Sequence, residues 1–138
     1  MVYDGEPDEV AERFKKEGNE HLALKTDQGA RDAISIYTNA ISLDLTDKQL
    51  EITLYNNRAQ AHLNIKNWGH ALNDCKEVMK RDVENMKALY RSAKALLGLE
   101  RLEDAEEMIV LLEGESIDTK ELRAILNRKR AIIVKVEE

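Results

Sequence analysis

The sequence carries an internal repeat with a period of 34 residues, which restricts the possible folds more than any other feature. A shift of 34 residues places Tyr55 on Leu89 and Ala59 on Ala93. The same shift aligns further positions of like size: Leu63 with Leu97, Trp68 with Leu102, Ala71 with Ala105, Cys75 with Ile109, and Val78 with Leu112. Small residues coincide with small ones and large apolar residues with large ones. The units are therefore predicted to share one local structure and to stack.

The period and its small residues resemble the tetratricopeptide repeat, in which small side chains let two antiparallel helices approach closely. Ala59 and Ala71 take the small-residue positions of the second unit, and Ala93 and Ala105 those of the third. One proline and six glycines in 138 residues also favour an all-α chain over a sandwich or barrel. The resemblance implies three tetratricopeptide hairpins in a short right-handed superhelix, plus a C-terminal capping helix.

An upstream copy of the unit is recognisable but longer than the other two. Its landmarks are Phe14, Gly18, Ala33, Tyr37 and Ala40. Three extra residues separate Phe14 from Ala33, and four extra residues separate Ala40 from Tyr55 of the second unit. The insertions fall in the polar stretches 26–29 and 46–48, which are predicted to form turns. Added loop residues cost little entropy there.

The hairpin pattern predicts six helices, at 8–25, 29–44, 48–65, 68–81, 85–98 and 102–113. A seventh is expected to begin at Asp118, which forms a possible capping box with Glu121. Its apolar residues should cover the third hairpin: Leu122, Ile125, Leu126, Ile132 and Ile133. Its basic residues should face water: Lys120, Arg123, Arg128, Lys129, Arg130 and Lys135. The expected division is an N-terminal extension (1–7), three repeats (8–114) and a capping helix (115–138).

Several sequence properties bear on compartment and partners. Apolar runs are shorter than the roughly 18 residues of a membrane span, and the N-terminus lacks the regions of a secretory signal. The single cysteine, Cys75, cannot form an internal disulfide, which agrees with a reducing compartment. A net charge of −6 argues against general nucleic-acid binding, which depends on neutralising phosphates. We expect a monomer of the cytosol or nucleus, without a membrane or nucleic-acid partner.

Five polar residues fall on one face of the first helices of the three hairpins. If Ala11, Ile52 and Met86 are position 1 of each unit, these residues occupy positions 2, 5, 6 and 9. They are Lys15 and Asn19 in unit one, Asn57 in unit two, and Lys87 and Arg91 in unit three. Positions three or four residues apart share a helix face. Because the apolar landmarks at positions 4, 8 and 11 face into the hairpin, stacking is expected to bring the five polar side chains into one groove.

These residue types suit a ligand with two neighbouring carboxylates. Lysine and arginine carry fixed positive charge, a guanidinium can hold a carboxylate through two hydrogen bonds, and asparagine donates without adding charge. The C-terminal Asp or Glu of a protein fits, because it carries a main-chain and a side-chain carboxylate. Charge-assisted bonds of about 1.5–3 kcal/mol each, less the cost of ordering a peptide, predict roughly micromolar affinity.

The segments that hold these residues resemble the dicarboxylate clamp of tetratricopeptide co-chaperones, which bind the EEVD tails of heat-shock proteins 90 and 70. The segments are 14–19 (FKKEGN), 54–59 (LYNNRA) and 87–91 (KALYR). Residues 3–12 (YDGEPDEVAE) are similar to the family of the yeast cyclophilin-seven suppressor and animal tetratricopeptide-repeat protein four, whose members carry a further C-terminal domain. The resemblance implies a co-chaperone domain whose peptide-binding set also includes Leu22, Gln60 and Lys94.

Two other classes of function remain open. The groove could take an internal acidic segment, or the terminal helix could mediate self-association, as in a scaffold. An enzyme ranks last, because no nucleophile arrangement, phosphate-binding glycine loop or metal cluster is visible, and no cofactor is expected. Other conspicuous side chains are predicted to pack or to face water: Cys75, His21, His62 and Trp68 in packing positions, and 128–130 (RKR) on a solvated helix face, with nuclear localisation as its alternative.

Overall fold

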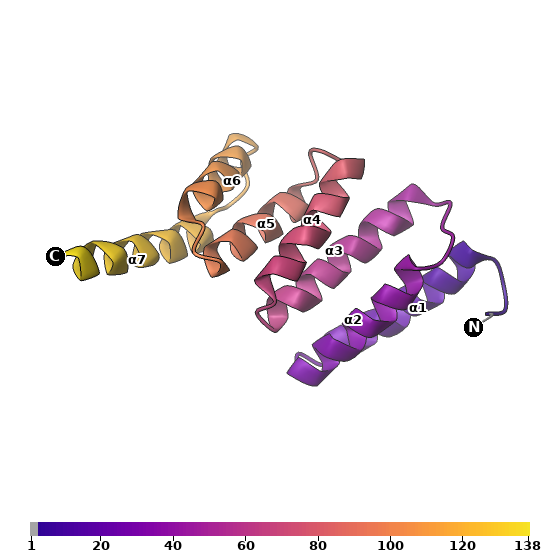
Figure 1. Ribbon diagram of the computed structural model, residues 1–138. Coiled ribbons are helices and arrows are strands. Elements are labelled where there is room, and N and C mark those ends of the chain that lie inside the picture. The colour runs from indigo at the N-terminus through magenta and orange to yellow at the C-terminus, as the bar shows by residue number, and fades with distance from the viewer. Residues whose placement is uncertain (1–2) are drawn as a thin grey trace.

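The computed structural model describes residues 3–138 as a row of α-helices, with no strand in this part of the chain (Figure 1). The helices are α1 (Pro7–Leu22), α2 (Asp27–Ile41), α3 (Lys48–Asn64), α4 (Trp68–Arg81), α5 (Met86–Gly98), α6 (Leu102–Gly114) and α7 (Lys120–Glu137). Pairs α1–α2, α3–α4 and α5–α6 stack in chain order, and α7 contacts α5 and α6. The all-α prediction is confirmed, while the assignment of three repeats to residues 8–114 stays a prediction. No described helix is both long and apolar enough to cross a membrane.

Small residues allow the helices of each pair to approach closely. The landmark alanines are completely buried: Ala33, Ala59, Ala71, Ala93 and Ala105. In the first pair the corresponding position on α1 is Gly18, where an added Cβ would overlap the ring of Tyr37 on α2. The ring therefore lies directly on the α1 backbone, and the interhelical contact tolerates no larger side chain at Gly18.

The turns that close the three hairpins share a left-handed residue at the same place. Lys25, Lys66 and Glu100 stand at equivalent places after α1, α3 and α5, and all three have left-handed backbones with φ of 56°, 61° and 61°. In the second turn the Asn67 N–H donates to the His62 carbonyl over 2.8 Å. This bond closes a Schellman-type helix end. The repeat seen in the sequence thus extends to the conformation of its connecting turns.

The first insertion lengthens a helix and does not form the predicted turn. α2 begins at Asp27, six residues before Ala33, whereas α4 begins three residues before its equivalent alanine. The Thr26 hydroxyl accepts a hydrogen bond from the Gly29 N–H over 2.9 Å and caps the added turn. An added Cβ at Gly29 would overlap the His21 carbonyl. A threonine cap and a glycine next to α1 therefore let the inserted residues become helical.

The second insertion lies at the junction of α2 and α3, as predicted. Asp47 caps α3 by accepting from the Leu50 N–H over 3.1 Å. The preceding Thr46 donates from its backbone N–H and its hydroxyl to the Asp8 carboxylate of α1, at 2.9 and 2.6 Å. These bonds, chiefly that of the Thr46 hydroxyl, lower the pKa of Asp8 below its ordinary value. The longer connection is therefore fastened to the start of the first helix.

The predicted capping box of α7 is wrong. The helix begins at Lys120 after Thr119, whose hydroxyl donates to Glu113 Oε2 over 2.7 Å and caps no backbone N–H of α7. Asp118 accepts from the Lys120 N–H over 2.9 Å in a local turn. Glu121, the predicted reciprocal cap, points to the preceding hairpin, with its carboxylate 3.9 Å from Lys94 Nζ. Contacts with α5 and α6 thus override the local capping pattern.

Only the first half of α7 covers the third hairpin. Leu122 and Leu126 are completely buried, and Ile125 packs against the same core. Ile132 and Ile133, predicted to help cover the hairpin, are 63% and 43% exposed. Figure 1 shows the reason, since the C-terminal part of α7 extends beyond the stacked hairpins.

Arg123 of α7 is predicted to face water, but in the structure it binds two carboxylates of α6. Its guanidinium binds Glu113 through two hydrogen bonds of 2.9 and 2.7 Å and reaches Glu106 over 2.5 Å. The bonds from Arg123 and Thr119 lower the pKa of Glu113 to about 2. This cluster joins α6 to the first turns of α7.

Candidate carboxylate-binding groove

The five predicted clamp residues lie on α1, α3 and α5, the first helices of the three hairpins: Lys15, Asn19, Asn57, Lys87 and Arg91. α3 contacts both of the other helices. Asn57 Nδ2 donates to Asn19 Oδ1 over 3.0 Å, which joins the first hairpin to the second. Asn57 and Lys87 line one pocket, which joins the second hairpin to the third. The structure therefore brings Asn19, Asn57 and Lys87 together in one continuous region.

The lengthened first hairpin still delivers its asparagine to the groove. Asn19 Oδ1 accepts the bond from Asn57 and a second one, of 2.5 Å, from the Tyr37 hydroxyl of α2. The repeat pattern indicates only a packing role for Tyr37 and does not predict this polar contact. Its signal was the hydroxyl itself, because the equivalent positions of the other units hold Cys75 and Ile109.

Two lysines supply the mobile positive charge of the groove. Lys15 lies one helical turn before Asn19, its side chain is 24% exposed, and its Nζ is 2.9 Å from Glu12 Oε2. A ligand carboxylate at Lys15 would therefore compete with Glu12. Lys87 is exposed and forms no ion pair with any residue from 3 to 138. Its ammonium is available to an incoming anion without displacing a protein carboxylate.

Within the described part of the chain, Arg91 is a half-buried cation that pairs with no carboxylate. Its Nε donates to Gln60 Oε1 of α3 over 3.1 Å, and its buried Nη1 has no hydrogen-bond partner among the described residues. Burial lowers the pKa of Arg91, an effect that the nearby Cys75 opposes, but a guanidinium stays charged at neutral pH. Binding an anion would offset part of this desolvation cost.

The guanidinium of the neighbouring Arg58, by contrast, is hydrogen-bonded to protein side chains. Its Nε and Nη2 bind the two carboxylate oxygens of Asp74 on α4 at 2.9 and 2.7 Å, and its Nη1 donates to Thr38 on α2 over 3.1 Å. This bonding raises the pKa of Arg58. This pair was not predicted, although Asp74 is a charged residue where the next repeat has Met108. Arg58 is therefore structural, whereas Arg91 has no carboxylate partner among residues 3–138.

The three remaining predicted residues extend the groove away from the clamp. Leu22 and Gln60 line one pocket near the end of α1. Gln60 and Lys94 line a second, partly apolar pocket of about 210 Å³ between α3, α5 and α7, with Trp68 and Ile125 in its wall. Gln60 also accepts the bond from Arg91, so this second pocket adjoins a clamp residue.

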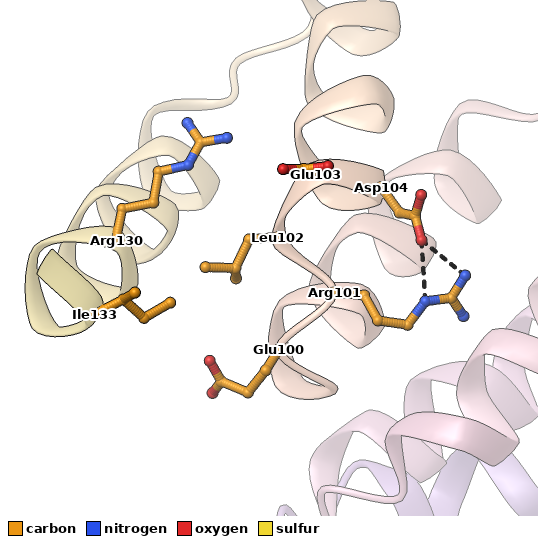
Figure 2. Close-up of a pocket in the computed structure, with 7 residues that line it drawn as sticks. All are labelled: Glu100, Arg101, Leu102, Glu103, Asp104, Arg130 and Ile133. Atoms are coloured by element: carbon orange, nitrogen blue, oxygen red, sulfur yellow. Dashed lines mark hydrogen bonds and ion pairs between the residues drawn. The ribbon is translucent and has the colours of Figure 1, made fainter. Parts of the chain in front are cut away.

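A different pocket, of about 500 Å³, separates the start of α6 from the second half of α7 (Figure 2). Arg130 and Ile133 of α7 face Glu100 and Leu102 across it, while Arg101 is held by Asp104 through bonds of 3.0 and 2.8 Å. None of the predicted clamp residues lines this pocket. It is therefore separate from the groove.

Most of the residues predicted to pack do so. Cys75 is completely buried, and burial raises the pKa of its thiol to about 11. Trp68 lies directly on Gly98, where an added Cβ would overlap the indole. His62 is buried, with its Nδ1 3.3 Å from Asn67 Nδ2.

His21 differs from its prediction: it is half-exposed, and its Nδ1 lies 3.7 Å from Asp32 Oδ2 of α2. Over residues 3–138 there is no cluster of three or more residues able to hold a metal.

Comparison with known sequences identifies co-chaperones as relatives, although no family model matches the chain. The Hsp70/Hsp90 co-chaperone cns1 of Schizosaccharomyces pombe is 45% identical over 111 residues, which are 80% of this chain and 30% of the relative. Tetratricopeptide repeat protein 4 of Homo sapiens is 32% identical over 133 residues, which are 95% of this chain and 33% of the relative. The chain thus spans about a third of the length of these relatives.

Solved structures with the same fold include two tetratricopeptide-repeat proteins. The Hsp90 co-chaperone Cns1 from Saccharomyces cerevisiae (delta69) matches with a TM-score of 0.84 and 31% identity, over 99% of this chain and 44% of that one. The second tetratricopeptide domain of human RPAP3, solved in complex with the HSP70 peptide SGPTIEEVD, matches with a TM-score of 0.71 and 26% identity, over 90% of this chain and 98% of that one. The fold is that of a tetratricopeptide-repeat domain.

Proposed function

We propose that this chain, a tetratricopeptide-repeat domain related to the co-chaperones Cns1 and tetratricopeptide repeat protein 4, binds the acidic C-terminal tail of heat-shock protein 90 or 70. The observation that carries the proposal is Arg91, a half-buried cation that no carboxylate of residues 3–138 neutralises. Lys87 lies one turn away on the same helix face, and the Asn19–Asn57 pair approaches from the other hairpins. This arrangement suits a dicarboxylate.

The proposed ligand contacts divide between the two carboxylates of the terminal residue. Lys15, Asn19 and Asn57 supply one ammonium and two amides from α1 and α3, and Lys87 and Arg91 supply two cations from α5. Charge-assisted hydrogen bonds contribute about 1.5–3 kcal/mol each. After the cost of ordering a flexible tail, roughly micromolar affinity remains. Such a complex exchanges readily, as a co-chaperone contact requires.

The pockets beside the clamp suit the residues upstream of the terminal acid. The peptide bound to RPAP3 carries an isoleucine directly before its EEVD end. A side chain of this kind fits the partly apolar pocket walled by Trp68 and Ile125, while Gln60 and Lys94 can bind the peptide backbone or its acidic side chains. Changing that upstream residue to serine is expected to weaken binding without removing the requirement for a free terminal acid.

Calorimetric titration tests the proposal with a peptide ending in Glu-Glu-Val-Asp, as the free acid and as the C-terminal amide. We expect the acid to bind with roughly micromolar affinity and the amide or an Arg91→Ala variant to bind at least tenfold more weakly, since a charge-assisted bond is lost. Arg31→Ala is the matched control. Arg31 is exposed on α2, so this substitution removes the same charge outside the groove. Equal affinity for acid and amide would refute the proposal.

The same titrations distinguish tail binding from binding of an internal acidic segment. A measurement of molecular mass without peptide tests self-association. An internal acidic segment would bind without a terminal carboxylate, and self-association would raise the measured mass with concentration when no peptide is present. Added salt should weaken tail binding, because the charge of Lys87 is exposed to solvent. We further propose that the domain acts only as a binding module, without catalysis, in the cytosol or nucleus.

A further inference from the structure

We infer that Tyr37 is a positioning residue of the groove, whose hydroxyl turns the NH2 group of Asn19 toward the ligand. The inference rests on the proposed function and adds to it a residue from α2, the second helix of its hairpin. No part of Tyr37 is exposed to solvent. It therefore acts through Asn19 and does not touch the ligand.

The hydrogen bonds around Asn19 determine which way its amide points. Its Oδ1 accepts from the Tyr37 hydroxyl over 2.5 Å and from Asn57 Nδ2 over 3.0 Å. A carbonyl oxygen has two lone pairs, so these donors fill its capacity. Turning the amide over would place its NH2 against the Asn57 NH2, which cannot accept a hydrogen bond, and would remove the acceptor for the Tyr37 hydroxyl proton. The Asn19 NH2, which donates to no residue described here, is therefore left facing outward at an exposed position.

The surroundings of Tyr37 keep its hydroxyl in place and protonated. The ring is completely buried and lies on the backbone at Gly18, where an added Cβ would overlap it. Burial raises the pKa of Tyr37 to about 12, so at neutral pH the hydroxyl retains its proton and donates it to Asn19. A rigid donor beneath the groove reduces the entropy that Asn19 would lose on binding.

Tyr37 and Asn19 occur together only in the first unit of the repeat. The positions equivalent to Tyr37 are Cys75 and Ile109, neither of which carries a hydroxyl. The positions equivalent to Asn19 are Gln60 and Lys94. A phenol is thus present in the unit where a short amide must be oriented. The packing position would be satisfied by phenylalanine, so the hydroxyl calls for a further explanation.

Tyr37→Phe tests the inference, because it keeps the ring and removes one oxygen. We expect the affinity for the free-acid EEVD peptide to fall about three- to tenfold, which is the usual effect of losing one neutral hydrogen bond. The control is Tyr55→Phe on α3, since the Tyr55 hydroxyl makes no hydrogen bond with residues 3–138. Circular dichroism checks that both variants remain folded. Wild-type affinity in a folded Tyr37→Phe domain overturns the inference.

A double-mutant cycle separates positioning from general packing. In an Asn19→Ala background, Tyr37→Phe is expected to cause no further loss of affinity, because the residue through which it acts is gone. An equal loss in both backgrounds would overturn the inference. The Asn19 NH2 signals in an NMR spectrum are a separate measurement, and they should shift in Tyr37→Phe without peptide. If the wild-type domain binds no acidic tail, the proposed function fails, while unchanged NH2 signals would overturn the inference on Asn19 orientation.

Discussion

Gly18 is the single residue on which the shape of the first hairpin most directly depends, because its missing side chain lets Tyr37 lie against α1. Gly18→Ala is expected to lower the free energy of unfolding by about 1–3 kcal/mol, as in other overpacked cores. Gly69→Ala is the control: Gly69 lies in α4 with no atom within 4 Å of an added Cβ, so alanine should stabilise the helix by about 0.5–1 kcal/mol. Urea unfolding measures both. Equal effects of the two substitutions would contradict the packing argument.

His62 is expected to make stability depend on pH. Burial lowers its pKa below the ordinary 6.5, although Asp74, 4.0 Å away, opposes this effect. As the pH falls, the unfolded chain therefore binds a proton at this histidine before the folded chain does. The contribution of His62 to stability is fully present above pH 6.5 and is lost as the pH drops through the folded pKa. Urea unfolding from pH 8 to pH 5 should show this decline, and His62→Gln should reduce it. His21→Gln, at a half-exposed site, serves as the comparison; no difference between the variants would contradict the assignment.

At the scale of the element, α7 has two halves with different energetic roles. Leu126 is completely buried against the third hairpin, so Leu126→Ala is expected to cost about 2–5 kcal/mol. Removal of residues 132–138 should change the free energy of unfolding by less than about 0.5 kcal/mol, because the large apolar residues there are already exposed. Urea unfolding of the two variants provides the comparison. A large cost of the truncation would show that the exposed segment contributes to stability after all.

Across the whole molecule, the hairpins are joined by polar contacts as well as by apolar packing. Arg58 of α3 links Asp74 on α4 to Thr38 on α2, and Asp74 is only 3% exposed. Asp74→Ala leaves a largely buried guanidinium unpaired and is expected to cost about 3–5 kcal/mol.

Replacing both members of this pair, in Arg58→Met with Asp74→Leu, should restore most of the lost stability, since no buried charge then remains. The free energy of unfolding in urea measures the recovery. Asp104→Ala, which breaks the exposed pair with Arg101, is the control and should have little effect. If the Asp74 and Asp104 variants were equally stable, the pair would have no special role in stabilising the second hairpin.

The sequence by itself determined the helical hairpins, their small-residue contacts and the helix face that carries Lys15, Asn19, Asn57, Lys87 and Arg91. These features follow from local periodicity, because residues three or four apart share a face whatever surrounds the helix. The positions of the helix ends were less predictable, as the added turn of α2 and the start of α7 show. There, caps and contacts with neighbouring helices compete with local signals.

Which side chains support the groove depends on how the helices pack in three dimensions. The bond from Tyr37 to Asn19 spans 18 positions in the chain, and that from Asn57 to Asn19 spans 38. Such contacts depend on the distance and rotation between packed helices, which a repeat pattern does not specify. The same holds for the contrast between Arg58, bound to Asp74, and Arg91, which has no carboxylate. Five polar residues were visible in the sequence, but the donor orientation of Asn19 and the unneutralised charge of Arg91 arise from packing.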